Sequence, residues 1–596
     1  MAPARVMEIS GSVEQGYIAP SDAAHENEWY NQDFDGYRVT EEPLHAKRHL
    51  RIVCVGAGAS GLQIAYKAER ALSDIDLQIY EKNSDVGGTW LENRYPGCTC
   101  DIPSHSYQFT WARNPNWSQY YSSSEEIWQY FKDVAVKYDL EKYVQLNTTV
   151  ESAEWNEQEG QWKVTVLGPN GKQTEDWCDV LISGELLSYT CHFRTDLEGS
   201  GVLNSWKYPD IPGLDLFKGK LMHSAKWDSD YDLSGKRVAV IGGGSSAVQI
   251  VPNIQPTVGK LYAFLRSPVW VTTGFGAKHA GPGGTNFEYS QHQIQKWKDD
   301  PESYQKYARD VEGELNKRFN LMHMHSNDQK NSRELIASIM DERIGNERIS
   351  KRLVPNFALG CRRMTPGQGY LESLRKDNVE VIHESAVRLT ETGIVDESGV
   401  EHEVDVVICA TGFDTSFTPH FKMTGRNNAD IKEQFGDFPV GYLGITVHNF
   451  PNFFLFIGPN GPASHSSILP ILEWYTRYAF NMIAKFQTEN LKSFEVKAAA
   501  VKDLYNHTHE IMKRLVWSSA CRSWFKNGKT HGPVTAIYPG SRLHFFELLK
   551  EVRWEDYDLE YRTGNRFQFL GNGYTFTEMS PDGDPVWYFD DDFTKI

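Results

Sequence analysis

The sequence contains 596 residues, with 61 Lys and Arg against 79 Asp and Glu, so its formal net charge is −18. This acidic balance argues against sequence-independent binding to nucleic acid or anionic lipid, because such binding requires clustered basic residues. With 40% hydrophobic and 23% charged residues, the composition is that of a globular protein. At roughly 100–200 residues per domain, we expect about three or four structural units.

No stretch of about 18 apolar residues is present, and the first residues lack the apolar core of a secretory signal. We therefore expect a cytoplasmic protein with no membrane-spanning helix and no obligate protein partner. The eight cysteines form no Cys-x-x-Cys pair, so their spacing indicates neither a metal site nor a disulfide framework.

The first segment, residues 1–47, is polar with little periodicity, and we expect an arm on the surface. Residues 50–83 then predict a strand, a glycine turn, a helix and a second strand. In the turn, Gly56 permits the tight bend, Gly58 lets the backbone approach a pyrophosphate, and Gly61 lets the helix pack on the sheet. Glu81 ends the second strand, where a carboxylate can accept ribose hydroxyls, so the pattern predicts a dinucleotide site.

A second strand, turn and helix are predicted at residues 236–254. The turn has the pattern Gly-x-Gly-x-x-Ala and supplies the candidate contacts Gly242, Gly244, Ser245, Ser246 and Ala247. The strand that follows ends in Arg266 and Ser267 instead of an acidic residue. A guanidinium binds the 2′-phosphate that a carboxylate would repel, so we expect NADPH here. The alternative is that Arg266 is an ordinary surface charge.

Two dinucleotide sites in one chain indicate FAD and NADPH as cofactors. They predict an α/β fold with two Rossmann-like dinucleotide-binding domains. The strands expected at 405–413 and 453–462 each end in a glycine turn, and we expect both to return to the first of these domains. Alternating aromatic residues at 557–579 predict short hairpins near the C-terminus.

The predicted domain boundaries follow from these patterns. The FAD domain is expected at 48–208 and again at 405–596, where it includes the C-terminal hairpins. The NADPH domain is expected at 209–275 and 359–404. Residues 276–358 are charged and favour helices, which predicts a helical insertion.

Disulfide reductases also bind two dinucleotides, but they need a redox-active cysteine pair beside the first helix. Cys98 and Cys100 have the wrong spacing for that chemistry, so a structural role is predicted for both.

Between the two glycine turns, Phe217, Gly219, His223, Trp227 and Asp228 match the pattern Phe-x-Gly-x-x-x-His-x-x-x-Trp-(Pro/Asp). By this motif the chain resembles the Baeyer–Villiger monooxygenases, the class B flavin-dependent monooxygenases, from about residue 48 to about residue 550. Related N-hydroxylating and S-oxidising enzymes usually carry Tyr or Phe in place of Trp227. The resemblance implies a conformational role for His223 and Trp227. From the residues alone, His223 would more often be a linker histidine whose hydrogen bonds are satisfied within the protein.

The resemblance also implies contacts for single residues. The cofactor contacts expected outside the two glycine turns are Thr89, Trp90, Asp101, Tyr107, Val150, Arg362 and Trp524. Arg363 would be the catalytic arginine and Asp101 would orient it, although Met364 replaces the proline that usually follows. A second departure is the segment 185–200, either a lineage-specific loop or a translated intron.

The implied reaction depends on NADPH and O2 and inserts one oxygen atom next to a ketone carbonyl, through a C4a-peroxyflavin, to give an ester or lactone. A fixed cation favours the deprotonated peroxide, and Arg363 is the candidate. The sequence blocks most resemble fungal secondary-metabolism members, which favours a bulky polyketide or terpenoid ketone. The alternatives are a monooxygenase acting on S or N, and a flavoprotein that oxidises NADPH without oxygenating a substrate.

Overall fold

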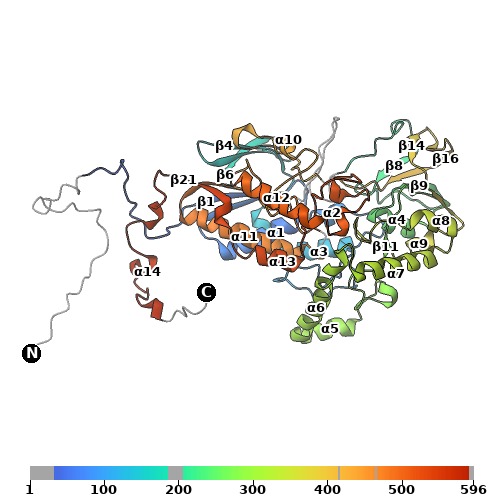
Figure 1. Ribbon diagram of the computed structural model, residues 1–596, viewed down its shortest axis with the longest axis horizontal. Coiled ribbons are helices and arrows are strands. Elements are labelled where there is room, and N and C mark those ends of the chain that lie inside the picture. The colour runs from blue at the N-terminus through green and yellow to red at the C-terminus, as the bar shows by residue number, and fades with distance from the viewer. Residues whose placement is uncertain (1–31, 185–205, 414–415, 464–465, 590–596) are drawn as a thin grey trace, which may run out of the picture. The chain divides into compact units, whose positions relative to one another are not determined.

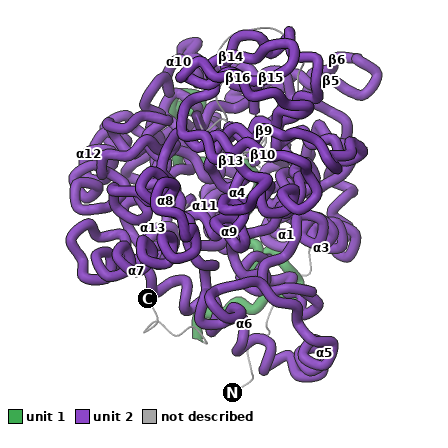
Figure 2. Tube along the Cα trace, turned by 90° about the vertical axis from the view of Figure 1, so that its right-hand side faces the viewer, with its two compact units in different colours: residues 1–46, 563–596 green, residues 47–562 purple. Residues whose placement is uncertain are grey.

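The computed structural model describes residues 32–184, 206–413, 416–463 and 466–589. It divides into two compact units, one formed by residues 1–46 and 563–596 and the other by residues 47–562 (Figure 2). The segment 185–200, with its two competing interpretations, lies outside the described residues.

The larger unit contains two five-stranded parallel sheets. The first has the order β19-β7-β1-β2-β3 and defines the first lobe (Figure 1). Its strands are β1 (Leu50–Val55), β2 (Ile75–Tyr80), β3 (Val144–Gln145), β7 (Val180–Ser183) and β19 (Phe453–Leu455). Helix α1 (Ala59–Ala71) connects β1 to β2 and packs beside α11 (Leu469–Thr488). The strand and helix predicted around the first glycine turn are confirmed.

The second sheet has the order β13-β10-β9-β17-β8 and defines the second lobe. Its strands are β8 (Lys220–His223), β9 (Arg237–Ile241), β10 (Lys260–Phe264), β13 (Val379–Ile382) and β17 (Val406–Cys409). Helix α4 (Ser245–Ile254) follows β9, as the second glycine turn predicts. All neighbouring strands in this sheet are parallel.

One strand assignment was wrong. The strand predicted at 405–413 was expected in the first lobe, but β17 pairs with β8 and β9 in the second sheet. The later strand β19 does return to the first sheet, beside β7. Strand β17 is a short apolar run that is buried throughout, as are β7 and β19 of the first sheet, so the pattern does not show which sheet it joins.

The segment predicted as a helical insertion, residues 276–358, is largely helical. It contains α5 (Gln291–Asp299), α6 (Pro301–Asn316), α7 (Asn327–Ile344) and α8 (Glu347–Leu353), drawn in green in Figure 1. Each of the four helices has an N-cap residue whose side chain accepts a hydrogen bond from a backbone N–H group of the first turn. These N-cap residues are Ser290, Asp300, Ser326 and Asn346.

Smaller elements complete the larger unit. The sheet β18-β4-β5-β6 contains β4 (Thr149–Asn156), β5 (Gln161–Leu167), β6 (Gln173–Cys178) and β18 (Lys422–Thr424). The other strands are β11 (Val271–Thr272), β12 (Thr365–Pro366), β14 (Ala386–Leu389), β15 (Gly393–Asp396), β16 (Glu401–Glu403), β20 (Leu491–Val496) and β21 (Tyr557–Tyr561). The other helices are α2 (Thr89–Glu92), α3 (Ser124–Lys137), α9 (Tyr370–Ser373), α10 (Ile431–Phe435), α12 (Ala498–Met512) and α13 (Arg542–Leu548).

The C-terminal hairpins were not found. Strand β21 pairs with β20, which lies far away in sequence, and the residues after it form the helical turns η10 (Gln568–Leu570) and α14 (Phe576–Met579). A capping box between Thr575 and Glu578 starts α14. This local capping overrides the alternation of aromatic residues. The N-terminal arm is held to this tail by backbone hydrogen bonds, such as Leu44 N to Tyr574 O at 2.7 Å.

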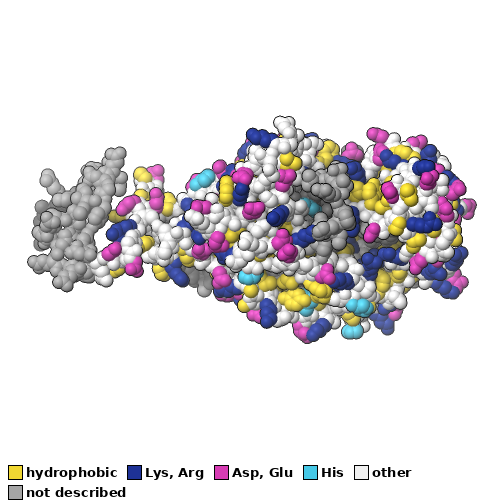
Figure 3. All heavy atoms as spheres, turned by 90° about the horizontal axis from the view of Figure 1, so that it is seen from above, with side chains coloured by type: hydrophobic (Ala, Val, Ile, Leu, Met, Phe, Trp, Pro, Cys, Tyr) yellow, Lys and Arg dark blue, Asp and Glu magenta, His cyan; other side chains and the backbone are white. Residues whose placement is uncertain are grey.

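The surface of the larger unit carries both signs of charge. On the face drawn in Figure 3, basic and acidic side chains are interspersed. Within the described ranges, no helix combines the length and the apolar character needed to cross a bilayer.

Candidate active site

The first glycine turn leaves the start of α1 open for an anion. Gly61 is confined by its surroundings, because a Cβ atom there would lie 2.2 Å from the carbonyl oxygen of Gly56. No side chain caps the helix at Gly58, so its first N–H groups are not satisfied by a side-chain acceptor. Gly88 faces Gly58 backbone to backbone, since a Cβ on Gly88 would lie 3.1 Å from the Gly58 Cα. These features fit a pyrophosphate at the helix N-terminus.

The carboxylate of Glu81 lies beside the same turn. The side chain is buried and accepts hydrogen bonds from the backbone N–H groups of Ala57 (2.7 Å) and Asn83 (2.9 Å). Glu81 directly follows β2, at the strand end where the sequence predicts it, and its contact with a ribose stays a prediction. Val150 is buried in β4.

The second glycine turn is equally open. Helix α4 has Gly244 at its N-cap with no side-chain cap, and a Cβ on Gly244 would meet nothing within 4 Å. Ser245 bonds to Thr365 through their hydroxyl groups at 3.1 Å. The space at this helix start fits a second dinucleotide.

Two arginines gather behind the second turn. Arg266 is exposed after β10, and Ser267 is half-buried beside it. The guanidinium of Arg362 donates to the carbonyl oxygen of Pro268 at 3.3 Å, so it lies against the turn that carries Arg266. Burial lowers the pKa of Arg362, and the charge of Arg522 adds to the effect. A phosphate group bound beside Arg362 would offset both the burial of its guanidinium and the repulsion from Arg522.

Asp101 and Arg363 form a bidentate ion pair. Arg363 Nη2 lies 2.6 Å from both carboxylate oxygens of Asp101, and Nε lies 3.1 Å from Oδ2. Burial acts to lower the pKa of Arg363, but the charge and hydrogen bonds of Asp101 outweigh it and raise that pKa. The guanidinium is therefore a permanent cation in a fixed orientation.

Two aromatic side chains lie in the same region. The indole N–H of Trp90, in α2, donates to the Tyr107 hydroxyl at 3.0 Å, and the two rings meet edge to face. Burial raises the pKa of Tyr107, so this hydroxyl remains protonated. Thr89 begins α2 next to them.

His223 lies where the chain connects the two lobes. It ends strand β8 and stacks on Trp206 with ring centroids 4.4 Å apart. Its Nδ1 accepts from the backbone N–H of Ala225 at 3.1 Å, so Nε2 carries the proton and donates to Thr411 Oγ1 at 3.3 Å. Burial lowers the pKa of His223 to about 4, which keeps the ring neutral. Trp227 is half-buried against the core of the second lobe.

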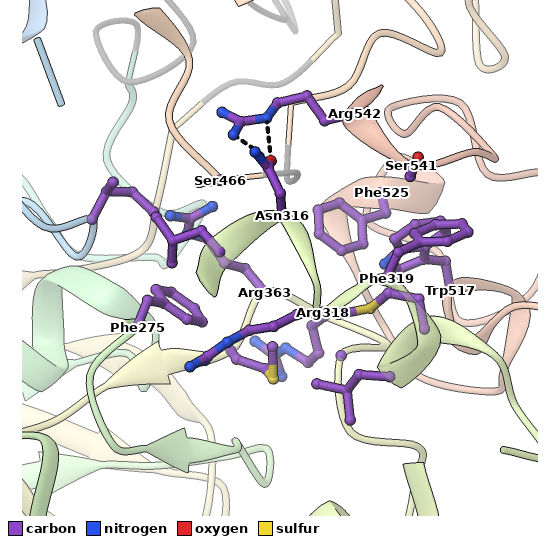
Figure 4. A pocket seen from close by; sticks show the side chains of 17 residues that line it. Phe275, Asn316, Arg318, Phe319, Arg363, Ser466, Trp517, Phe525, Ser541 and Arg542 are labelled. Carbon is purple, nitrogen blue, oxygen red and sulfur yellow. Dashed lines mark hydrogen bonds between the residues drawn. The ribbon is translucent and has the colours of Figure 1, made fainter. Parts of the chain in front are cut away.

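A cavity of about 900 Å³, its open mouth included, opens at Arg363 (Figure 4). Its lining comes from both lobes and the helical insertion: Ile102, Phe275, Leu315, Asn316, Arg318, Phe319, Leu321, Met322, Gly360, Arg362, Arg363, Met364, Ser466, Trp517, Phe525, Ser541 and Arg542. Figure 4 shows Phe319, Trp517 and Phe525 grouped on one side and Phe275 on the other. A ligand here would be held mainly by apolar contact.

Several cavity residues were missed by sequence reasoning. The insertion supplies six of them, from the end of α6 and the helical turn η5 (Phe319–Met322), although its charged pattern gave no sign of a binding wall. Trp524, predicted as a cofactor contact, does not line the cavity, whereas Trp517 and Phe525 do, and the ring centroids of Trp524 and Phe525 lie 4.6 Å apart.

The prediction of no disulfide was also wrong. Cys361 and Cys521 are bonded across a sequence separation of 160 residues. Cys98 and Cys100 are buried free thiols, as predicted for structural cysteines. In the described part of the chain, no group of three or more His, Cys, Asp or Glu side chains could hold a metal ion.

These features define a protein with two dinucleotide-binding lobes and a substrate-sized cavity between them and a helical insertion. The family model "Flavin-binding monooxygenase-like" matches residues 49–350. FAD-binding monooxygenase tazF of Aspergillus terreus is 42% identical over 92% of this chain and 95% of its own length. A Baeyer–Villiger monooxygenase of Pseudomonas aeruginosa is 31% identical over 87% of this chain and 93% of its own length.

The chain therefore belongs to the flavin-binding monooxygenase family, in the group that includes the Baeyer–Villiger monooxygenases. Its fold also matches cyclohexanone monooxygenase of Rhodococcus sp. Phi1 bound to NADP+, with a TM-score of 0.72 and 24% identity over 87% of this chain and 100% of the other. OTEMO in complex with FAD and NADP gives the same TM-score over 86% of this chain and 100% of the other. The predicted family resemblance and fold class are confirmed.

Proposed function

We propose that this chain is an FAD- and NADPH-dependent Baeyer–Villiger monooxygenase that converts a bulky ketone into an ester or lactone. The observation that carries the proposal is the Asp101–Arg363 ion pair at the edge of a largely apolar cavity. The family assignment and the two open glycine turns support it.

FAD would occupy the first lobe, and NADPH the second. The residues proposed to hold FAD are Gly56, Gly58, Gly61, Glu81, Thr89, Trp90, Tyr107 and Val150. Those proposed to hold NADPH are Gly242, Gly244, Ser245, Ser246, Ala247, Arg266, Ser267 and Arg362, with Trp524 nearby. When bound, the two cofactors supply hydride transfer and the activation of O2, chemistry that no amino-acid side chain performs.

Arg363 would supply a fixed positive charge at the reacting atoms. A cation favours an anionic nucleophile and stabilises the oxyanion that forms when the ketone carbonyl is attacked. One such donor is worth about 2.7–4 kcal/mol in comparable sites. Asp101 contacts Arg363 through two nitrogen atoms and therefore acts as a positioning residue.

The cavity walls would exclude water while the substrate reacts. Phe319, Trp517 and Phe525 provide apolar surface on one side of the cavity, and Met364 and Ile102 also line it. Exclusion of water strengthens the electrostatic effect of Arg363 and protects reactive oxygen from side reactions. His223 would transmit lobe movement, because it bonds to Thr411 and stacks on Trp206.

The test is oxygenation by the FAD-loaded enzyme with NADPH, oxygen-18-labelled O2 and a panel of ketones and thioethers. We expect labelled esters or lactones from ketones, detected by mass spectrometry. Arg363→Ala should abolish ester formation while FAD remains bound, and the exposed Arg388→Ala should behave as wild type. Sulfoxides without esters would instead favour a heteroatom monooxygenase, and hydrogen peroxide alone would favour the oxygenation-deficient flavoprotein.

A further inference from the structure

The cavity at Arg363 is lined by four arginines and by no acidic residue. Its 17 lining residues include Arg318, Arg362, Arg363 and Arg542, while the remainder are apolar or small and polar. Buried or half-buried cations need partners, because an unpaired charge is costly to remove from water. The partner of each arginine therefore decides what kind of ligand the cavity accepts.

Two of the four arginines have their guanidinium groups occupied by the protein. Arg363 is held by both oxygens of Asp101. Arg542 is 3% exposed and bonds to Glu312, to Asn316 Oδ1 and to the carbonyl oxygen of Ser467. Neither presents an open pair of donors to a ligand.

Arg362 is assigned differently. It donates to the carbonyl oxygen of Pro268, next to the turn that carries Arg266. The proposed 2′-phosphate of NADPH would use its remaining donors. Arg362 therefore belongs to the nucleotide rather than to the substrate.

Arg318 is the arginine whose donors remain available. Its side chain is 38% exposed, and one nitrogen, Nη2, bonds to Glu314 one helical turn earlier. A guanidinium has five N–H donors in a planar fork. Among the described residues the other four have no hydrogen-bond partner. Glu314 does not line the cavity, so its carboxylate orients the guanidinium and leaves the other N–H donors of Arg318 unoccupied.

The surroundings of Arg318 fit a flat apolar ligand. The next residue, Phe319, packs against Trp517 with ring centroids 6.5 Å apart, and Figure 4 shows Arg318 between these rings and Phe275. The Tyr121 hydroxyl donates to the carbonyl oxygen of Phe275 at 2.6 Å. Burial raises the pKa of Tyr121, and the positive charge of Arg318 opposes that rise.

We propose that Arg318 binds an anionic oxygen group, a carboxylate or a phenolate, on the substrate. This inference rests on the proposed function: the ketone lies at Arg363, the flat apolar body lies against Phe319 and Trp517, and the acidic group pairs with the Arg318 fork. Arg318 is then a specificity-determining residue that selects acidic aromatic ketones from neutral ones of the same shape.

The experiment compares an acetyl-naphthoic acid with its methyl ester at neutral pH. The two compounds share the ketone and the ring system and differ in charge at one end. We expect KM for the acid to be at least tenfold lower than KM for the ester in wild-type enzyme. Arg318→Met should reduce this preference to near one, and Arg318→Lys should give an intermediate value, because lysine keeps the charge but lacks the fork.

Binding without turnover separates this inference from the proposed function. Naphthoic acid has no ketone, so calorimetry on enzyme loaded with FAD and NADP+ measures the anion site alone. We expect Arg318→Met to weaken its binding at least tenfold, and Arg309→Met, at an exposed position of the preceding helix α6, to leave it unchanged. Bound FAD and the thermal unfolding midpoint show that each variant is folded.

Equal KM values for acid and ester in wild type, or unchanged naphthoate binding in Arg318→Met, would overturn the inference. Failure of all ketones to be oxygenated, with naphthoate still bound through Arg318, would overturn only the proposed function.

Discussion

Cys361 is bonded to Cys521, and the bond joins two parts of the cavity wall. Cys361 directly precedes Arg362 and Arg363 in sequence. Cys521 lies in the loop between the helical turns η7 (Val516–Ser518) and η8 (Trp524–Lys526), which carry Trp517 and Phe525. The position of the arginines relative to the aromatic wall therefore depends on a covalent bond.

The first prediction concerns this bond. Reduction frees a loop of 160 residues in the unfolded chain, and the chain-entropy model assigns such a crosslink about 5 kcal/mol at most. We expect dithiothreitol to lower the thermal unfolding midpoint and raise KM for ketones, as measured by calorimetry and steady-state kinetics. The double variant Cys361→Ser with Cys521→Ser serves as the control. An equal response of this variant to dithiothreitol would show that the effect comes from elsewhere.

The second prediction concerns Asp101. In Asp101→Asn the bidentate ion pair is lost and Arg363 no longer has a fixed orientation. Because small misplacements of catalytic groups are costly, we expect the oxygenation rate to fall on the order of 10–100-fold while FAD content is unchanged. Ester formation and the flavin absorbance spectrum measure the two quantities. The exposed Asp76→Asn should leave both unaltered, and a wild-type rate in Asp101→Asn would remove this carboxylate from the mechanism.

The third prediction concerns the pH dependence of stability. The pKa of His223 is about 4 in the folded protein, below the ordinary 6.5, so the unfolded chain takes up the proton first as the pH falls. Stability from this group is complete above about pH 6.5 and is lost progressively down to about pH 4. Between about pH 7 and pH 5 the loss is about 2 kcal/mol.

His223→Gln should remove this part of the acid sensitivity. Thermal unfolding midpoints of wild type and variant, compared across this pH range, measure the difference. The exposed His531→Gln should keep the wild-type slope. Buried His105 and half-buried His420 also have lowered pKa values, so some acid sensitivity should remain in every variant. Parallel pH profiles for wild type and His223→Gln would contradict the assignment.

The fourth prediction concerns the choice of nucleotide. If Arg266 and Arg362 bind the 2′-phosphate, replacing Arg266 with Ala should raise KM for NADPH at least tenfold and hardly change KM for NADH, which lacks that group. Initial rates of nucleotide oxidation give both constants. Arg388→Ala again serves as the exposed control. Equal losses with both nucleotides would mean that Arg266 does not recognise the phosphate.

Local sequence patterns predicted the elements of this fold well. Glycine spacing located both turns, because Gly61 and Gly244 stand where a side chain would collide or would fill the anion site. Charged, helix-favouring stretches located the helical insertion. The destination of β17 was not predictable, since its apolar run is the same as that of a strand in either sheet. In the C-terminal tail, the capping box at Thr575 outweighed the alternation that had favoured hairpins.

Local sequence patterns could not predict contacts between residues that are far apart in the sequence. The Asp101–Arg363 pair joins residues 262 positions apart, and only the family resemblance brought the two residues together in advance. The disulfide was missed for the same reason. The cavity wall at Arg318 and Phe319 was not predicted, because charged residues at the end of a helix usually indicate solvent-exposed surface.

The backbone enters and leaves the second lobe at one place, and the Cys361–Cys521 disulfide is a further covalent link between residues 206–411 and the rest of the chain. Trp206, where the chain enters, and Thr411, where it leaves, both contact His223. A lobe whose backbone begins and ends at one point is a topological insert, so residues 206–411 could be exchanged for those of a relative with two cuts, provided that the replacement keeps a cysteine at position 361 to pair with Cys521. Chimaeras joined at these positions would exchange the lobe proposed to bind NADPH and leave the lobe proposed to bind FAD intact.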